Sequence, residues 1–548
     1  MNQGFKACIS SPEGSHSAPL NELILFEDEH LLVANKPAGW NTHAPAPYAG
    51  EGLYDWLRHR EPRWAGLAII HRLDKETSGV IVFSKTALAN RSLTHQFTER
   101  AVRKTYVLLT DKPVSSRQST VVSTLKKVGD HYASQPFRAG AERAETRFHV
   151  ASSQAGQTRL SAEPLTGRTH QIRVHAASSG FPVLGDTLYG GSPAPRVCLH
   201  AASIEFQHPA SGNLVKFEAG CDFSANTRGQ FRMAVIDINE TNAYRLIHGA
   251  ADGSPGWYVD RLGAFLLSQS DTDLTASQMA TLREIQTKLG IRGAYHKVLT
   301  RHVRQSKTPD VSPVLVLGEE APDEFLIREN GLNFLLSFRE GYSVGLFLDQ
   351  RDNRRRFITG HVAAGFPLFQ NPTQECEVLN TFAYTCGFSV CAARSGAQVT
   401  SLDLSPKYLE WGRRNFTLND LDPAGHDFIY GDTFDWLKRF AKKKRLFDAV
   451  ILDPPTFSQS REYGVFRVER DYGRLVASAL NVLRPGGTLL ASTNAAKIDP
   501  ENFVRTVSEA VSTSGRKIGQ KHYVPQPPDF PITRSEPGYL KTLWLRIE

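Results

Sequence analysis

The spacing of apolar positions changes along this chain, and it predicts different kinds of structure in its two halves. In the first part, short apolar runs at 24–26, 31–33 and 81–83 are bounded by turn residues. Runs of this length and setting are typical of strands. Further on, 265–267 predicts another strand and 277–289 predicts a helix.

After about residue 346 the pattern becomes strand, helix, strand, helix. Apolar strands at 377–379, 399–402 and 449–452 alternate with helical stretches, one of which begins near Phe388. This alternation is typical of a doubly wound parallel sheet.

These changes predict four segments. We expect a disordered tail at 1–19, which is rich in Ser, Gly and Pro. An α+β domain with a mixed antiparallel sheet is expected at 20–225, and a small α+β linker domain at 233–345. The segment 346–548 is expected to form an α/β doubly wound, Rossmann-like domain.

Composition limits the partners and the cellular location that we expect, but it does not decide the function. The 548 residues contain 64 Lys and Arg against 56 Asp and Glu, a mild basic excess that permits a polyanionic partner. No apolar run is long enough to span a bilayer, and the N-terminus does not resemble a secretory signal. The cysteines show no C-x-x-C spacing, so we expect no metal and a reducing, cytoplasmic location. They are Cys8, Cys198, Cys221, Cys376, Cys386 and Cys391.

Three separated motifs in the first half carry candidate chemistry. They are HRLDKETSG at 71–79, RKTY at 103–106 and TGRTHQIRVH at 166–175. Taken alone, Asp74 of the first motif is better interpreted as a loop carboxylate paired with Arg72. Taken together and in this order, the motifs resemble those of the RluA-type pseudouridine synthases, and the resemblance runs from about residue 21 to 223.

The resemblance implies roles for four residues. Asp74 would be the nucleophile, and Arg173 would pair with it and keep it ionised. Tyr106 would stack on the target base, although a core aromatic is the alternative for it. Arg72 would fill the space left by the flipped base. Whether Asp74 attacks the sugar or the base, or abstracts a proton, stays open, and no cofactor is implied.

A second group of candidate residues lies directly after the predicted strands of the C-terminal half. A strand, loop and helix at 377–388 form the kind of unit at which doubly wound sheets bind ligands, although no G-x-G-x-x-G is present. Acidic residues follow the next strands, and a D-P-P loop follows the strand at 449–452. An aspartate at a strand end serves as a helix cap about as often as a ligand. The candidate cofactor-binding residues are Asn380, Phe382, Tyr384, Thr385, Gly387, Asp403, Asp432 and Asp453.

From about residue 242 to the C-terminus the chain resembles rRNA methyltransferases of the RlmI and RlmK type. The segment GLFLDQRDNR at 345–354 is a hallmark of that group. The resemblance implies S-adenosylmethionine as cofactor and places Arg351 near it.

The methyl acceptor is open between two chemistries. Methylation of cytosine C5 requires a cysteine nucleophile, and relatives place it after the D-P-P strand or on the following one. Neither position has a cysteine here, which favours a guanine nitrogen, unless the nucleophile comes from elsewhere in the fold. Pro454, Pro455 and Asn494 are candidate substrate-binding residues, and a capping role for Asn494 is equally plausible.

The sequence therefore predicts a bifunctional RNA-modifying enzyme, with large-subunit rRNA as the expected partner. In an alternative reading the N-terminal half serves only to bind RNA. In another, the enzyme methylates a small molecule, which leaves the fused N-terminal half unexplained. No membrane association is expected, and the oligomeric state is open.

Overall fold

Three large sheets organise the chain in the computed structural model. It describes residues 23–138, 140–224, 227–299, 312–340, 343–371, 375–460 and 464–548. The tail expected at 1–19 lies outside these residues.

The N-terminal part is built on an eleven-stranded mixed sheet in the order β1-β2-β4-β10-β5-β9-β8-β6-β7, with β3 beside β4 and β11 beside β10. Its strands are β1 Ile24–Glu27, β2 Leu31–Lys36, β3 Ala68–Ile69, β4 Ser78–Ser84, β5 Arg103–Thr110, β6 Gln118–Val128, β7 His131–Pro136, β8 Ala144–Gln154, β9 Gln157–Pro164, β10 Leu199–Gln207 and β11 Leu214–Glu218. Helices α1 (Leu53–Arg60), α2 (Ala87–Thr98) and α3 (Gln171–Ser178) accompany it, with the short turns η1 (Pro62–Trp64) and η2 (Thr187–Tyr189).

The parallel pair β4–β10 lies at the centre of this sheet. Ser78 and Gly79 pair with His200 and Ala201. Gly79 has a φ of 114°, and a Cβ there would lie 2.2 Å from the carbonyl oxygen of Ala201. Only glycine allows this approach, which brings the 71–79 motif against the middle of the sheet.

A smaller sheet follows helix α4 (Thr227–Val235). Its order is β12-β13-β14-β15-β16. The strands are β12 Ala243–His248, β13 Trp257–Leu262, β14 Phe265–Ser270, β15 Gly293–Val298 and β16 Val314–Gly318, with η3 Gly249–Asp252 after β12. Helix α5 (Ala276–Leu289) begins at a capping box between Thr275 and Gln278 and ends at Gly290 in the left-handed region.

The C-terminal part contains a seven-stranded sheet in the order β23-β22-β21-β24-β27-β29-β28, parallel except around β29. Its strands are β21 Glu377–Thr381, β22 Gln398–Asp403, β23 Asp427–Tyr430, β24 Phe447–Leu452, β27 Leu483–Thr493, β28 Ile518–Val524 and β29 Lys541–Ile547. The helices are α6 Arg351–Thr359, α7 Gly387–Arg394, α8 Pro406–Thr417, α9 Thr433–Lys442, α10 Val468–Leu480 and α11 Pro500–Thr513, with the turns η4 Leu348–Gln350 and η5 Pro423–Gly425. The hairpins are β17 Phe325–Glu329 with β18 Leu332–Leu336, β19 His361–Ala363 with β20 Phe366–Pro367, and β25 Phe457–Ser460 with β26 Gly464–Arg467.

The predicted elements are confirmed where the structure describes them. The runs at 24–26, 31–33 and 81–83 lie in β1, β2 and β4, and the helix predicted at 277–289 is α5. The three strands predicted in the C-terminal half are β21, β22 and β24, which are parallel neighbours. The predicted fold class, a mixed α+β sheet followed by a Rossmann-like sheet, is therefore correct.

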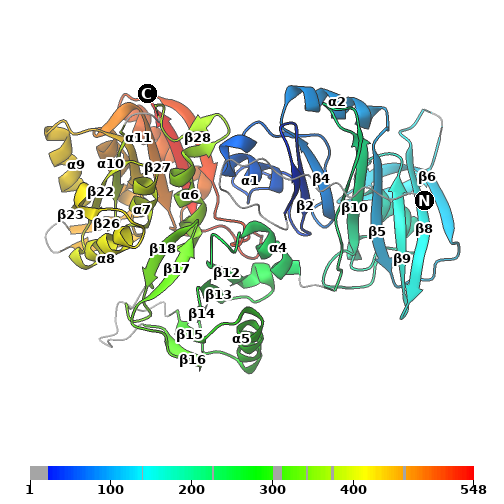
Figure 1. The fold of residues 1–548 in the computed structure, drawn as a ribbon, viewed down its shortest axis with the longest axis horizontal. Helices are drawn as coiled ribbons and strands as arrows, with labels where there is room; N and C mark the ends of the chain where they lie inside the picture. The colour runs from blue at the N-terminus through cyan, green and yellow to red at the C-terminus, as the bar shows by residue number, and fades with distance from the viewer. Residues whose placement is uncertain are drawn as a thin grey trace, which may run out of the picture.

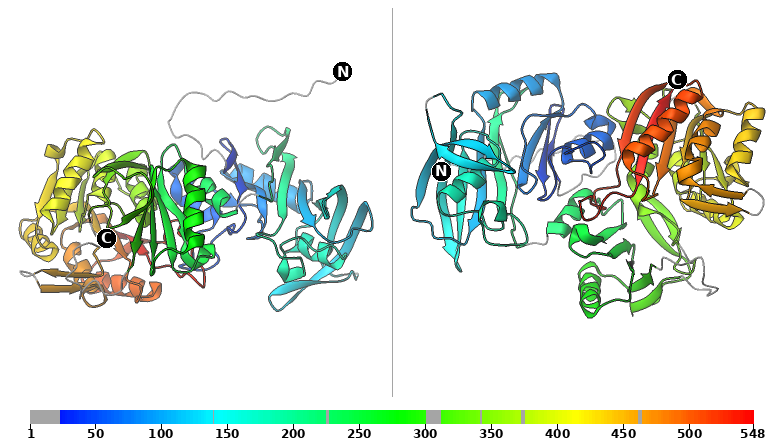
Figure 2. Two further views of the ribbon diagram at one scale, coloured as in Figure 1. Left: turned by 90° about the horizontal axis from the view of Figure 1, so that it is seen from below. Right: turned by 180° about the vertical axis from the view of Figure 1, so that it is seen from behind.

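Figure 1 shows how the parts of the chain are arranged. The N-terminal sheet and the C-terminal sheet lie at opposite ends, α1 faces α6 between them, and the β12–β16 sheet lies to one side. The two further views agree with this arrangement (Figure 2). Among the described residues, no helix has the length and apolar character needed to cross a membrane.

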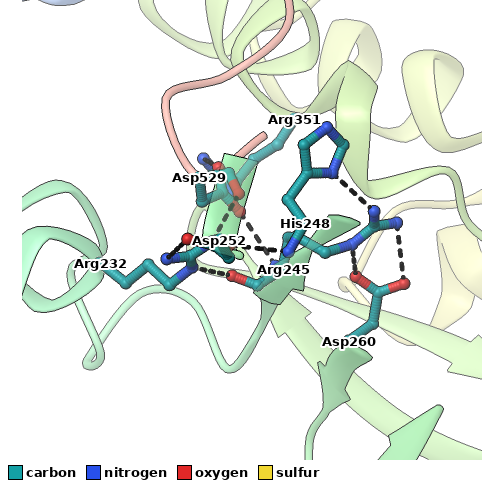
Figure 3. A network of polar contacts seen from close by, with 7 residues as sticks. All are labelled: Arg232, Arg245, His248, Asp252, Asp260, Arg351 and Asp529. Carbon is teal, nitrogen blue, oxygen red and sulfur yellow. Dashed lines mark hydrogen bonds and ion pairs between the residues drawn. The ribbon is translucent and has the colours of Figure 1, made fainter. Parts of the chain in front are cut away.

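A buried network of charges ties the smaller sheet to the C-terminal part (Figure 3). Arg351 on α6 donates from both Nη atoms to the carboxylate of Asp529, at 3.0 and 2.6 Å. Asp529 also accepts from the backbone N–H of Arg245 on β12, at 3.0 Å. Arg232 on α4 pairs with Asp252, and Arg245 pairs with Asp260. Removal of one partner would leave the other charge buried and unpaired. This network therefore fixes how these segments pack.

Candidate active sites

A cleft of about 950 Å³ opens in the N-terminal part and is lined by all three sequence motifs. Asp74 lies in the loop between β3 and β4, Tyr106 on β5, and Arg173 on α3. Arg72 is exposed on the wall of the cleft. The structure thus brings together the four residues that the sequence analysis singled out from separate motifs.

Arg173 is placed so that one guanidinium contacts two carboxylates. Its Nε and Nη2 donate to Asp186, at 2.7 and 2.8 Å. Its Nη1 lies 3.9 Å from Oδ2 of Asp74. The side chains of Arg173 and Asp186 are 5% and 1% exposed, whereas that of Asp74 is 28% exposed. Asp186 therefore orients the guanidinium, and Asp74 is free to face the cleft.

The hydroxyl of Tyr106 stays protonated near neutral pH. Burial, and next the negative charge of Asp74, raise the pKa of Tyr106 above its usual range. Burial lowers the pKa of His71, behind the same wall, to about 3. The Nε2 of this neutral ring accepts from the backbone N–H of Val82, at 3.1 Å. His71 therefore supports the loop, while Tyr106 offers an aromatic ring and a neutral hydroxyl.

Two charged residues of this site were missed by the sequence analysis. Asp186 follows the apolar run 181–184, and a lone carboxylate after such a run was the available signal. Lys36, at the end of β2, is fully buried and donates to the carbonyl oxygens of Pro37, Trp40 and Lys75. Burial lowers the pKa of Lys36 to about 7. It fixes the residue next to Asp74 by contacting the carbonyl of Lys75.

Replacement of Asp186 by Asn should leave the Arg173 charge buried without its bidentate partner. Breaking such a pair costs about 3–5 kcal/mol, so we expect a clearly lower free energy of unfolding of the N-terminal part in denaturant titrations. Asp130→Asn, at an exposed hairpin turn, is the matched control and should change it by less than about 0.5 kcal/mol. Equal stability of the two variants would contradict the anchoring role of Asp186.

In the C-terminal part, the candidate residues gather at the carboxyl ends of parallel strands. The loop after β21 contains three non-glycine residues in the left-handed region: Phe382, Tyr384 and Cys386, with φ of 54°, 49° and 64°. Each such residue costs about 1–3 kcal/mol and is typical of ligand-binding loops. Tyr384 donates its N–H to Oδ2 of Asp403 at the end of β22, at 2.8 Å.

The carboxylate of Asp403 accepts hydrogen bonds from two different loops. Oδ1 accepts from the N–H of Ser405, at 2.9 Å, while Oδ2 accepts from Tyr384. Burial raises the pKa of Asp403, against the lowering effect of these backbone hydrogen bonds. The carboxylate therefore joins the strained loop to the end of β22.

Asp453 of the D-P-P loop faces the 345–354 segment. Its Oδ2 accepts from Nε2 of Gln350, at 3.0 Å. Burial, followed by the nearby charge of Asp349, raises the pKa of Asp453 to about 7. Pro454 is buried next to it, and Pro455 is exposed. Two motifs about a hundred residues apart thus meet at one point.

Comparison with known families now identifies the two halves. Residues 245–546, more than half of the chain, match the family model of S-adenosylmethionine-dependent methyltransferases. The chain belongs to this methyltransferase family. Residues 30–178 match the model of RNA pseudouridylate synthases, so the resemblance to the RluA-type enzymes in the N-terminal half is confirmed.

Several individual proteins are similar to this methyltransferase. A ribosomal RNA large subunit methyltransferase of Deinococcus radiodurans is 34% identical over 317 residues, which are 57% of this chain and 74% of that protein. The ribosomal RNA large subunit methyltransferase I of Klebsiella pneumoniae is 28% identical over 416 residues, or 74% and 96% of the two chains. Among solved structures, a SAM-dependent methyltransferase of Streptococcus mutans has 29% identity and a TM-score of 0.47, covering 58% of this chain and 78% of that one.

The cofactor of this methyltransferase family is S-adenosylmethionine, and the residues present fit it. The strained loop after β21 and the carboxylate of Asp403 at the adjacent strand end lie where a doubly wound sheet binds a nucleoside. A carboxylate oxygen has lone pairs that can accept hydrogen bonds from a ribose diol. S-adenosylmethionine supplies an already activated methyl group when bound.

The side chains of four predicted cofactor residues form hydrogen bonds or ion pairs with other groups of the protein. Asn380 donates to Ser389, and Thr385 donates to the carbonyl of Gly345. Asp432 caps α9 by accepting from Phe434 and Asp435. Arg351 belongs to the buried network with Asp529. These contacts restrain the four side chains, and Arg351 is not among the cofactor contacts proposed below.

Proposed function

We propose that this chain is a bifunctional RNA-modifying enzyme that isomerises uridine to pseudouridine and methylates a base, with large-subunit rRNA as substrate. One observation carries the isomerase assignment: Asp74, Arg173 and Tyr106 line a single cleft. The names of the relatives from Deinococcus and Klebsiella support the rRNA substrate. Exposed Arg72, Arg100 and Arg168 line the same cleft and suit a polyanion.

In the isomerase site, Asp74 is the proposed nucleophile. The guanidinium of Arg173 favours its ionised form and restrains its position. Tyr106 stacks on the everted uracil, and its neutral hydroxyl is available for proton transfer. Arg72, exposed on the cleft wall, reaches into the helix from which the base has left.

In the methyltransferase site, we propose that Asp403, Asp453 and the loop 382–387 bind the cofactor, and that Pro454, Pro455 and Asn494 face the acceptor base. Asn494 is exposed directly after β27. Because the donor is already activated, alignment of the acceptor atom provides most of the rate.

A guanine nitrogen is the proposed acceptor, and the cysteines support this choice. Burial raises the pKa of Cys386 to about 12, and it also raises the pKa of Cys391 well above the usual range. Both side chains are fully buried thiols. A thiol that does not ionise is a poor nucleophile, so neither provides the attack on C6 that cytosine C5 methylation requires.

Nucleoside analysis of rRNA tests the whole assignment. In rRNA from a strain lacking this gene, we expect the loss of one pseudouridine and one methylguanosine, both restored by the intact gene. Liquid chromatography with mass spectrometry of mapped fragments measures this. Loss of 5-methylcytidine instead would reject the guanine acceptor, and loss of methylation alone would support an N-terminal half that only binds RNA.

A further inference from the structure

The N-terminal and methyltransferase parts meet around helix α1. Glu61, directly after α1, forms an ion pair with Arg355 on α6. Nε2 of His361 on β19 lies 3.3 Å from the carbonyl oxygen of Arg58 on α1. The rings of Tyr48 and Tyr523 are in contact, with centroids 4.9 Å apart. In Figure 1, α1 lies beside α6 and close to β28.

Three potential metal ligands converge at this contact. Glu51 precedes α1, His59 lies in its last turn, and His522 lies on β28 of the methyltransferase part. One ligand atom of each lies within 4.8 Å of the other two. Nδ1 of His59 is 2.7 Å from Oε1 of Glu51. The two imidazole rings have centroids 4.3 Å apart.

An unsatisfied atom gives the cluster a second, independent signal. Nε2 of His522 is buried and has no hydrogen-bond partner among the described residues. Leaving such an atom without a partner costs about 1–3 kcal/mol, so it calls for an explanation. An imidazole nitrogen without a hydrogen-bond partner has a lone pair that a metal ion can take.

We propose that Glu51, His59 and His522 bind a zinc ion that joins the two halves of the protein. Two imidazole nitrogens and one carboxylate are a ligand set that zinc takes in proteins, with a fourth position left for water. A cavity of about 10 Å³ borders Glu51 and His59, which is about the space of one water molecule.

The surroundings favour zinc over harder cations. Arg60, Arg355 and Arg356 line the same cavity. Arg355 pairs with Glu61, and Arg356 donates to the carbonyls of Val362 and Asp352. This positive charge opposes any dication, but magnesium and calcium also depend on oxygen ligands, and the cluster offers only the carboxylate of Glu51. Zinc gains affinity from imidazole nitrogen, so it tolerates the setting better.

Bound zinc would link α1 to β28 and thereby fix the separation of the two active sites. The ligands come from both ends of the chain, so no spacing in the sequence reveals them. The expectation that the protein has no metal rested on the cysteines and did not address this cluster.

Zinc titration of the full chain tests the site. After chelator treatment and dialysis, the protein should bind one equivalent of Zn²⁺ in isothermal titration calorimetry, and Mg²⁺ should give no heat. His59→Ala and His522→Ala should each weaken zinc binding about 100-fold, and Glu51→Gln about tenfold, by analogy with losses around known sites. With Co²⁺ as probe, the wild type should show visible d–d absorption that these variants lose.

His361→Ala is the matched control, since His361 lies at the same contact but outside the cluster. Its zinc affinity should remain within about twofold of the wild type. Circular dichroism checks folding, and Glu51→Gln, which preserves side-chain size, covers the case in which a histidine variant does not fold. No zinc heat in the wild type, or equal zinc affinity in folded wild type and cluster variants, would overturn the proposal.

Discussion

Pseudouridine formation should fall by roughly 10⁴-fold or more when Asp74 is replaced by Asn, because removal of a catalytic nucleophile has effects of this size. The amide has nearly the same shape as the carboxylate, so the cleft should remain intact. It cannot form the covalent intermediate, however, and it loses its charge interaction with Arg173. Release of tritium from 5-tritiated uridine in rRNA fragments measures the isomerisation directly.

Methylation by the Asp74→Asn protein should stay at the wild-type rate, because the methyltransferase residues lie on a different sheet. Glu99→Gln is the matched charge-removing control: Glu99 is exposed beside the cleft residues Thr98 and Arg100. It should alter isomerisation no more than about twofold. If Asp74→Asn kept wild-type tritium release, Asp74 would not be the nucleophile.

Cofactor binding should weaken about 10–100-fold when Asp403 is replaced by Asn. The carboxylate is the charged acceptor proposed for the ribose hydroxyls, and a hydrogen bond to a charged group is worth about 1.5–3 kcal/mol. The substitution also weakens the contact with the N–H of Tyr384 that holds the strained loop. Calorimetric titration with S-adenosylhomocysteine gives the affinity, and isomerisation serves as the readout of an intact N-terminal half.

The control for this variant is Asp420→Asn. Asp420 is exposed, in the same part of the chain, and has a φ of 56°, which asparagine adopts readily. Its cofactor affinity should match that of the wild type. An Asp403→Asn protein that binds the cofactor as tightly as this control would remove Asp403 from the proposed site.

The local pattern of apolar and polar residues in the sequence was sufficient to predict the strands and to recognise the motifs. The run in β4 is buried on both faces, as expected for a central strand, and its apolar residues already show this in the sequence. The alternation of β21, α7 and β22 follows from residues that are close along the chain. The three N-terminal motifs also lie on segments short enough to be recognised one by one.

The convergence of charges was decided by packing alone. Arg173 lies within the motif at 166–175, and Asp186 follows that motif closely in the sequence. Only the placement of α3 against the sheet makes them a bidentate pair next to Asp74. The pairing of Arg351 was decided in the same way, because its partner Asp529 lies in a loop 178 residues further on.

Short-range sequence pattern thus specifies the types of elements, the resemblance to two families and the candidate nucleophile. Each depends on neighbouring residues, whose spacing sets which side chains share a face or a loop. Which charged and polar groups meet depends instead on how distant segments pack, as with Asp186, Lys36 and the cluster of Glu51, His59 and His522. The energy of a charge depends on its distance to other charges and on its exposure to water, and both are set only when these segments pack.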